Sequence, residues 1–179
     1  MLLLAAEGVT ILSIRPLLSA HVFIGMLLIP PVALKLGSTG WRFVRYYRGD
    51  HEYRAKGPPL LPLRMLAPLV VASTLAVFAT GVALLVAGPG RGVLLGLHKA
   101  SFVIWLGVTA IHVLAHLRRL PGLVAADWRG DASAAPAGSF ARRALIAAAL
   151  VAGAVLATFT VRYAQPWVHW AALFRGGDG

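Results

Sequence analysis

The feature that most constrains this chain is an apolar run at residues 93–117 that contains three histidines. A run of this length is typical of a helix that crosses a bilayer, which needs about 20 residues. Ionisable side chains at that depth are costly, and they usually have a partner or a function. His98 and His112 are 14 residues apart. Fourteen helical residues turn by about 1400°, close to four full turns, and rise by about 21 Å, so both side chains share one face at two depths.

Three further apolar runs, at residues 16–36, 65–88 and 144–162, are each about as long as a spanning helix. The chain is 59% hydrophobic and only 13% charged, a composition typical of integral membrane proteins. No run alternates polar and apolar residues, so we expect an all-α fold. The prediction is a single membrane domain, residues 1–179, folded as a four-helix up-and-down bundle.

Basic residues are divided unevenly between the two sides of this bundle. Of the 17 Lys and Arg residues, 12 lie in or beside the first and third connections and five on the other side. Positive charge accumulates on the cytoplasmic side, so we expect both termini to be extracytoplasmic in a multi-pass protein of the cytoplasmic membrane. Topology signals and contact with lipid headgroups account for the net charge of +11, so no nucleic-acid partner is expected.

The segments outside the four runs carry weaker signals. Residues 1–14 are apolar without a clear pattern and fit either the outer interface or an extension of the first helix; with Glu7 and no early basic residue, they do not resemble a cleaved signal peptide. Residues 37–63 mix arginine with aromatic residues, as in a segment that lies on the inner headgroups. We expect a tight turn at residues 88–92 and a short amphipathic piece at the outer interface near residues 165–170.

His21 lies five residues inside the first run, and His98 lies a similar distance inside the third. The first and third helices of an up-and-down bundle are parallel, so both imidazoles should lie at equal depth near the outer face. Paired histidines on neighbouring helices are typical ligands of b-type haem, although a buried histidine bonded to a backbone carbonyl is the alternative for either one alone. The chain has no cysteine, which excludes covalently attached haem and Cys-ligated clusters. We therefore expect His21 and His98 to bind the iron of one haem b.

Glycines accompany these histidines on three helices. Gly25 follows His21 by one turn, and Gly81 and Gly96 lie on the second and third helices. They would leave room for a flat macrocycle, and close packing between membrane helices explains such small residues equally well.

The inner half of the bundle has a less complete set of ligands. His112 has the face and depth for a second haem, but no histidine on another run opposes it. Lys35 lies 14 residues after His21, which makes a His112–Lys35 haem one interpretation. Lys35 could instead reach the inner headgroups or be turned away by a kink at the adjacent prolines, and His112 could bind a quinone. His116 could join His112 at a metal ion such as zinc, or face a haem propionate, a quinone carbonyl or the inner interface.

A resemblance to a known family rests on two segments, LSAHVFIGMLLIPPVALKLGSTGWRFVRYYRGD and LHKASFVIWLGVTAIHVLAH. They resemble the b-type subunits of formate dehydrogenases and nickel–iron hydrogenases and the compact proteins of the cytochrome b/b6-domain family. The resemblance implies that His21, His98 and His112 are ligands of haem iron. It also implies electron exchange with the quinone pool and with an extracytoplasmic redox protein subunit, in particular a molybdopterin oxidoreductase. The chain departs from the family pattern in lacking a fourth histidine at the inner site.

The function expected from these observations is transmembrane electron transfer by a b-type cytochrome. Because the chain has no flavin or nicotinamide motif, we expect an electron-transfer subunit of an oxidoreductase complex and not a complete enzyme. Two alternatives are a membrane metalloenzyme of the histidine-box type and a cofactor-free anchor or scaffold subunit.

Overall fold

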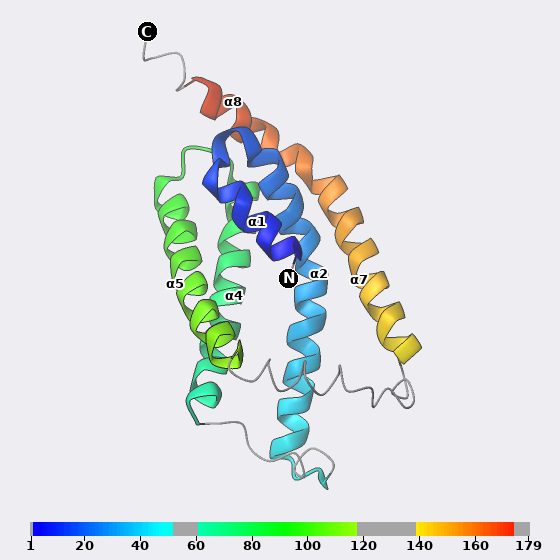
Figure 1. Cartoon of the computed structure of the whole chain (residues 1–179). Helices are drawn as coiled ribbons and strands as arrows, with labels where there is room; N and C mark the ends of the chain where they lie inside the picture. The colour runs from blue at the N-terminus through cyan, green and yellow to red at the C-terminus, as the bar shows by residue number, and fades with distance from the viewer. Residues whose placement is uncertain (1, 52–60, 118–138, 174–179) are drawn as a thin grey trace.

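The described part of the chain folds into helices (Figure 1). The computed structural model describes residues 2–51, 61–117 and 139–173, and no strand occurs among them, so the predicted all-α class is confirmed. The helices are, in chain order, α1 (Leu2–Leu12), α2 (Ile14–Tyr47), α4 (Leu61–Ala87), α5 (Gly92–Leu117), α7 (Ser139–Thr160), the short 3-10 helix η1 (Val161–Ala164) and α8 (Gln165–Leu173).

Four segments are long and apolar enough to cross a membrane, which indicates a multi-pass membrane protein. They are Ile14–Tyr47, Met65–Ala87, Gly92–Ala115 and Phe140–Leu173. Large apolar side chains such as Val86, Val103 and Phe159 are exposed on these segments, as contact with a lipid bilayer requires. The second and third segments agree with the predicted runs to within a few residues, whereas the first and fourth are longer.

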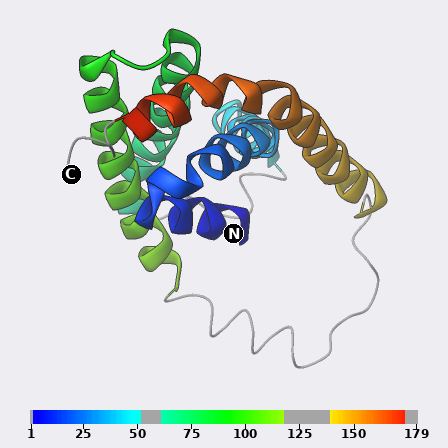
Figure 2. The same ribbon diagram turned by 90° about the horizontal axis from the view of Figure 1, so that it is seen from above.

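The helices pack as two antiparallel pairs, α4 with α5 and α2 with α7 (Figures 1 and 2). A small buried cluster of Met26, Leu85 and Ala157 joins α2, α4 and α7. In contrast, no Cα atom in the described part of α2 lies within 8 Å of one in α5. The two pairs therefore meet along one edge and leave space between α2 and α5.

Helix α2 continues well beyond the predicted run at residues 16–36. Its 34 residues include Pro30 and Pro31 and measure about 51 Å at 1.5 Å per residue, compared with about 30 Å for the hydrocarbon core. The segment from residue 37 to Tyr47 thus continues the spanning helix, which corrects the prediction of a separate piece on the headgroups; residues 52–60 lie outside the described part. The helix ends where Gly49 adopts a φ of 89°, the left-handed conformation that glycine supplies at helix ends.

Residues 2–12, for which the sequence left two interpretations open, form a helix of their own. Ser13, with φ −138° and ψ 57°, interrupts the helix between α1 and α2, and α1 folds back along α2 (Figure 1). This reversal brings the only polar side chains of α1, Glu7 and Thr10, to the level of His21. α1 therefore contributes to the site and does not simply extend the spanning helix.

Helices α7 and α8 close the bundle on the side of α2. A Cβ atom at Gly153 of α7 would collide with the backbone carbonyl of Leu27, so this close approach between α7 and α2 requires glycine. After η1, α8 begins with Pro166 in its first turn and crosses the end of the bundle that carries the α1–α2 and α4–α5 turns (Figures 1 and 2). α8 is the short piece that the sequence indicated there.

Candidate functional site

A cavity of about 420 Å³ lies among α1, α2, α4, α5 and α8. This volume lies within the range of pockets that hold small molecules and cofactors. Most of the described side chains that line it are aliphatic or aromatic, and the titratable ones are Glu7, His21, His98 and Lys99. The cavity is therefore an apolar chamber with a few polar groups, the common design of a cofactor site.

His21 and His98 face one another across this cavity. Their ring centroids are 6.5 Å apart, and their planes make an angle of 73°. The rings come from α2 and α5, whose backbones do not approach each other. The structure thus brings together the two histidines that the sequence analysis expected at equal depth. The cavity, and not another helix, lies between their backbones.

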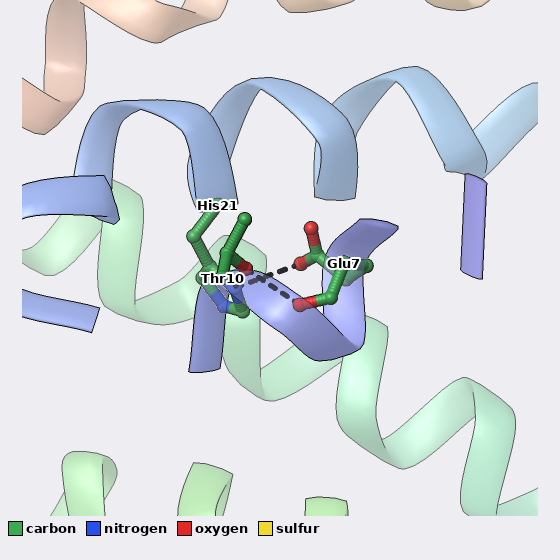
Figure 3. A network of polar contacts seen from close by, with 3 residues as sticks. All are labelled: Glu7, Thr10 and His21. Atoms are coloured by element: carbon green, nitrogen blue, oxygen red, sulfur yellow. Dashed lines mark hydrogen bonds and ion pairs between the residues drawn. The ribbon is translucent and has the colours of Figure 1, made fainter. Parts of the chain in front are cut away.

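The His21 ring is held through its Nδ1 atom by two side chains of α1 (Figure 3). Nδ1 lies 3.0 Å from Oε1 of Glu7 and 2.9 Å from Oγ1 of Thr10. The Thr10 hydroxyl donates its one hydrogen to the backbone carbonyl of Glu7, at 2.6 Å, so it accepts from the ring. Nδ1 of His21 therefore carries the hydrogen, and Nε2 keeps the lone pair.

The same arrangement recurs at His98 with different partners. Nδ1 of His98 lies 3.0 Å from Oγ1 of Thr80, which donates its hydrogen to the carbonyl of Ala76 at 2.7 Å. The Thr80 oxygen thus accepts from Nδ1. Ser101 lies 3.1 Å from the Thr80 oxygen and donates to the backbone carbonyl of His98. Both imidazoles therefore have the Nδ1–H tautomer, which leaves Nε2 as the nitrogen that can bind a ligand in the cavity.

Two of the three glycines that the sequence analysis selected line the cavity. A Cβ atom at Gly81 would lie 3.1 Å from Cε1 of His98, and one at Gly25 would lie 3.4 Å from Oε1 of Glu7. The absence of a side chain at Gly81 makes room for the imidazole of His98. The absence of one at Gly25 makes room for the Glu7 carboxyl group, which contacts His21. Gly96 differs, because a Cβ atom there would meet nothing within 4 Å.

The predicted inner residues are placed differently. Lys35 is exposed on α2 and His112 is half-buried on α5, and neither belongs to the described lining of the cavity. No hydrogen bond joins these two described side chains. An ammonium group gains more from water or headgroups than from an apolar interior, which accounts for the exposure of Lys35. His116 lies in the last turn of α5, and its side chain is outside the described residues.

Several residues of the site had no role in the sequence-based prediction. The sequence analysis used Glu7 only as an argument against a cleaved signal peptide. Yet Glu7 is the only acidic residue before Asp50 in the sequence, and it lies in an apolar segment, where a buried acid needs a partner. Thr80 on α4 gives no comparable signal, because threonine is common in membrane helices. Trp105 of α5 lines the cavity and donates from Nε1 to Oγ1 of Thr74 at 3.1 Å, and Trp167 of α8 also lines the cavity.

The chemistry of this site follows from the Nε2 lone pairs of His21 and His98, two residues that line the same apolar cavity. Neutral imidazole is a common metal ligand, and a hydrogen bond from its other nitrogen fixes its orientation. Within the described ranges, no three His, Cys, Asp or Glu side chains form a group that could enclose a metal ion.

No protein-family model, curated protein sequence or solved structure matches this chain.

Proposed function

We propose that this protein is a membrane cytochrome of the b type, which binds one haem between His21 and His98 and carries electrons across the bilayer. The observation that carries the proposal is the pair of imidazoles at 6.5 Å, each held at Nδ1, on opposite sides of an apolar cavity. A porphyrin supplies most ligands of its own iron, so the imidazoles of His21 and His98 would suffice to hold a haem here.

The distances fit this group. Two imidazoles on opposite sides of one metal ion, each with a metal–nitrogen bond of about 2 Å, have ring centroids roughly 6 Å apart. The separation of 6.5 Å between the rings of His21 and His98 agrees with that geometry. The glycines at positions 25 and 81 and the wide separation of α2 from α5 provide space around the two rings.

The residues of this chain would bind and shield the haem. His21 and His98 would be its axial ligands, while Glu7, Thr10 and Thr80 hold the two rings in register. The aliphatic and aromatic lining, including Trp105, would exclude water and keep the surroundings apolar. Bound haem iron supplies one-electron redox chemistry, and the ligands and dielectric of the protein set its potential.

Charge supports an orientation of the protein in the membrane, and the position of the cavity supports a depth for the haem. With 12 of 17 basic residues beside the first and third connections, the termini and α8 would be extracytoplasmic in the cytoplasmic membrane. The cavity contacts α1 and α8, so the haem would lie nearer the outer face, close to an extracytoplasmic redox subunit. Resemblance to the b-type subunits of formate dehydrogenase and hydrogenase supports quinone and a molybdopterin oxidoreductase as electron partners.

A second haem at His112 and Lys35 stays a prediction of the sequence. The outer pair has facing rings that are each held at Nδ1, whereas Lys35, the second ligand that an inner haem would need, is exposed on α2. We therefore assign one haem per chain.

The visible spectrum of the purified full-length protein tests the proposal. We expect a red preparation with sharp α and Soret bands in the reduced-minus-oxidised spectrum and one haem per chain. A colourless protein with stoichiometric metal would instead indicate a histidine-box metalloenzyme. A colourless protein without metal would indicate an anchor or scaffold subunit.

A further inference from the structure

Glu7 is a shielded acidic side chain in an otherwise largely apolar helix. Its side chain is only 17% exposed, and Oε1 lies 3.0 Å from Nδ1 of His21 (Figure 3). The other oxygen, Oε2, is buried and has no hydrogen-bond partner among the described residues. A buried carboxyl oxygen without a partner is costly. This cost points to a benefit that the carboxyl group brings to His21.

The need to anchor α1 against His21 does not by itself explain why residue 7 is acidic. Thr10 already accepts a hydrogen bond from His21 at 2.9 Å and is itself 5% exposed, so a neutral hydroxyl links α1 to the ring. The opposite imidazole, His98, is held by the hydroxyl of Thr80 and the backbone carbonyl of Val77, and no acidic side chain of the described residues forms an ion pair with it. The two imidazoles therefore differ by one acidic partner.

We propose that Glu7 is a positioning residue with two effects. With Thr10, it holds His21 in the Nδ1–H tautomer, with Nε2 left for a ligand. Its negative charge also lowers the reduction potential of iron bound at Nε2. The first effect belongs to the metal-free protein, and only the second rests on the proposed function. A carboxylate that accepts the Nδ1 hydrogen makes the imidazole a stronger donor, and it therefore favours the oxidised and more positive iron.

The tautomer can be measured without haem. In full-length protein prepared without haem and labelled with ¹⁵N-histidine, long-range ¹H–¹⁵N NMR correlations identify which ring nitrogen carries the hydrogen. We expect Nδ1–H at His21 in the wild type and loss of this preference in the Glu7→Leu/Thr10→Val double variant. His98, held by Thr80, should keep Nδ1–H in both proteins and so reports that the bundle is folded. An Nε2–H tautomer at His21 in the wild type, or an unchanged tautomer in the double variant, would overturn the positioning role.

The charge effect is measured as a reduction potential in haem-loaded protein. Glu7→Gln keeps an oxygen acceptor of the same size but removes the charge. We expect an unchanged haem-to-protein ratio and a more positive midpoint potential, equivalent to a shift of about tenfold in the reduction equilibrium. Asp50→Asn is the matched control, because it removes one acidic charge beyond the far end of α2, roughly 39 Å or more along the helix from His21.

The two variants together decide the charge effect. An unchanged potential in Glu7→Gln, or an equal shift in Asp50→Asn, would overturn it. A wild type that binds no haem would overturn the proposed function and the charge effect with it. The tautomer measurement would still decide the positioning role, so the two failures are distinguishable.

Discussion

The two halves of the bundle begin from the same sequence pattern and reach different structures. In the outer half, His21 and His98 face one another at 6.5 Å, and each ring is held at Nδ1 by a neighbour. In the inner half, Lys35 and His112 have the same spacing of 14 residues from these histidines, but Lys35 is exposed and the two are not joined. The helical period alone does not make a site.

The difference lies in the elements that support the ligands. The outer rings have partners on helices other than their own, Glu7 and Thr10 on α1 for His21 and Thr80 on α4 for His98. These partners fix the tautomer and the direction of each ring before any ligand arrives. Lys35 has a flexible side chain and no such support in the described structure. Preorganisation by partners from other helices distinguishes the two outer histidines from Lys35.

Removal of an outer ligand should have the largest effect. We expect His21→Ala and His98→Ala each to bring the haem-to-protein ratio of the purified protein close to zero, because each removes one of two axial ligands. His169→Ala is the control, since that exposed histidine of α8 bonds the backbone carbonyl of Gln165 and does not line the cavity as the described residues form it. Full haem content in both ligand variants would contradict the assignment.

Filling the space beside His98 should have the next largest effect. In Gly81→Leu the new side chain begins 3.1 Å from the imidazole, so the ring must move or α4 must shift, at about 1–3 kcal/mol. We expect lower haem content and a lower temperature of thermal unfolding. Gly96→Leu on α5 meets nothing at its Cβ atom and should leave both quantities unchanged. Equal effects of the two substitutions would show that general crowding is the cause.

Loss of the hydroxyl that holds His98 should have a smaller effect. Thr80→Val removes the hydroxyl that accepts from Nδ1 of His98, and loss of such a hydrogen bond costs about 1 kcal/mol. We expect a lower unfolding temperature and weaker haem retention. Thr158→Val, which removes an exposed hydroxyl that bonds within α7, is the matched control. A Thr80→Val protein as stable as the control would remove this hydrogen bond from the description of the site.

The inner variants should have the smallest effect. Because one haem is assigned to the outer pair, we expect His112→Ala and Lys35→Gln to keep the wild-type haem-to-protein ratio. A ratio that falls from two to one in either variant would establish a second, inner haem and would show that the two halves are functionally alike.

The spanning helices and the proximity of His21 to His98 could be predicted, because long apolar runs are strong local signals and the two histidines lie at similar depth within theirs. α1 could not, since residues 2–12 are apolar apart from Glu7 and Thr10, and only the reversal at Ser13 turns them onto α2. Glu7 was missed for the same reason, because its contact with His21 depends on that reversal. The extension of α2 to Tyr47 was missed because basic and aromatic residues fit an interfacial segment as well as a protruding helix. Long-range partners, and not local patterns, complete the site.

Low-temperature EPR of the oxidised wild-type protein tests most directly whether one iron joins α2 and α5 through two imidazoles. We expect a low-spin ferric haem signal, because two strong axial nitrogen ligands enforce that spin state. A high-spin ferric signal, or no haem signal at all, would contradict ligation by both His21 and His98.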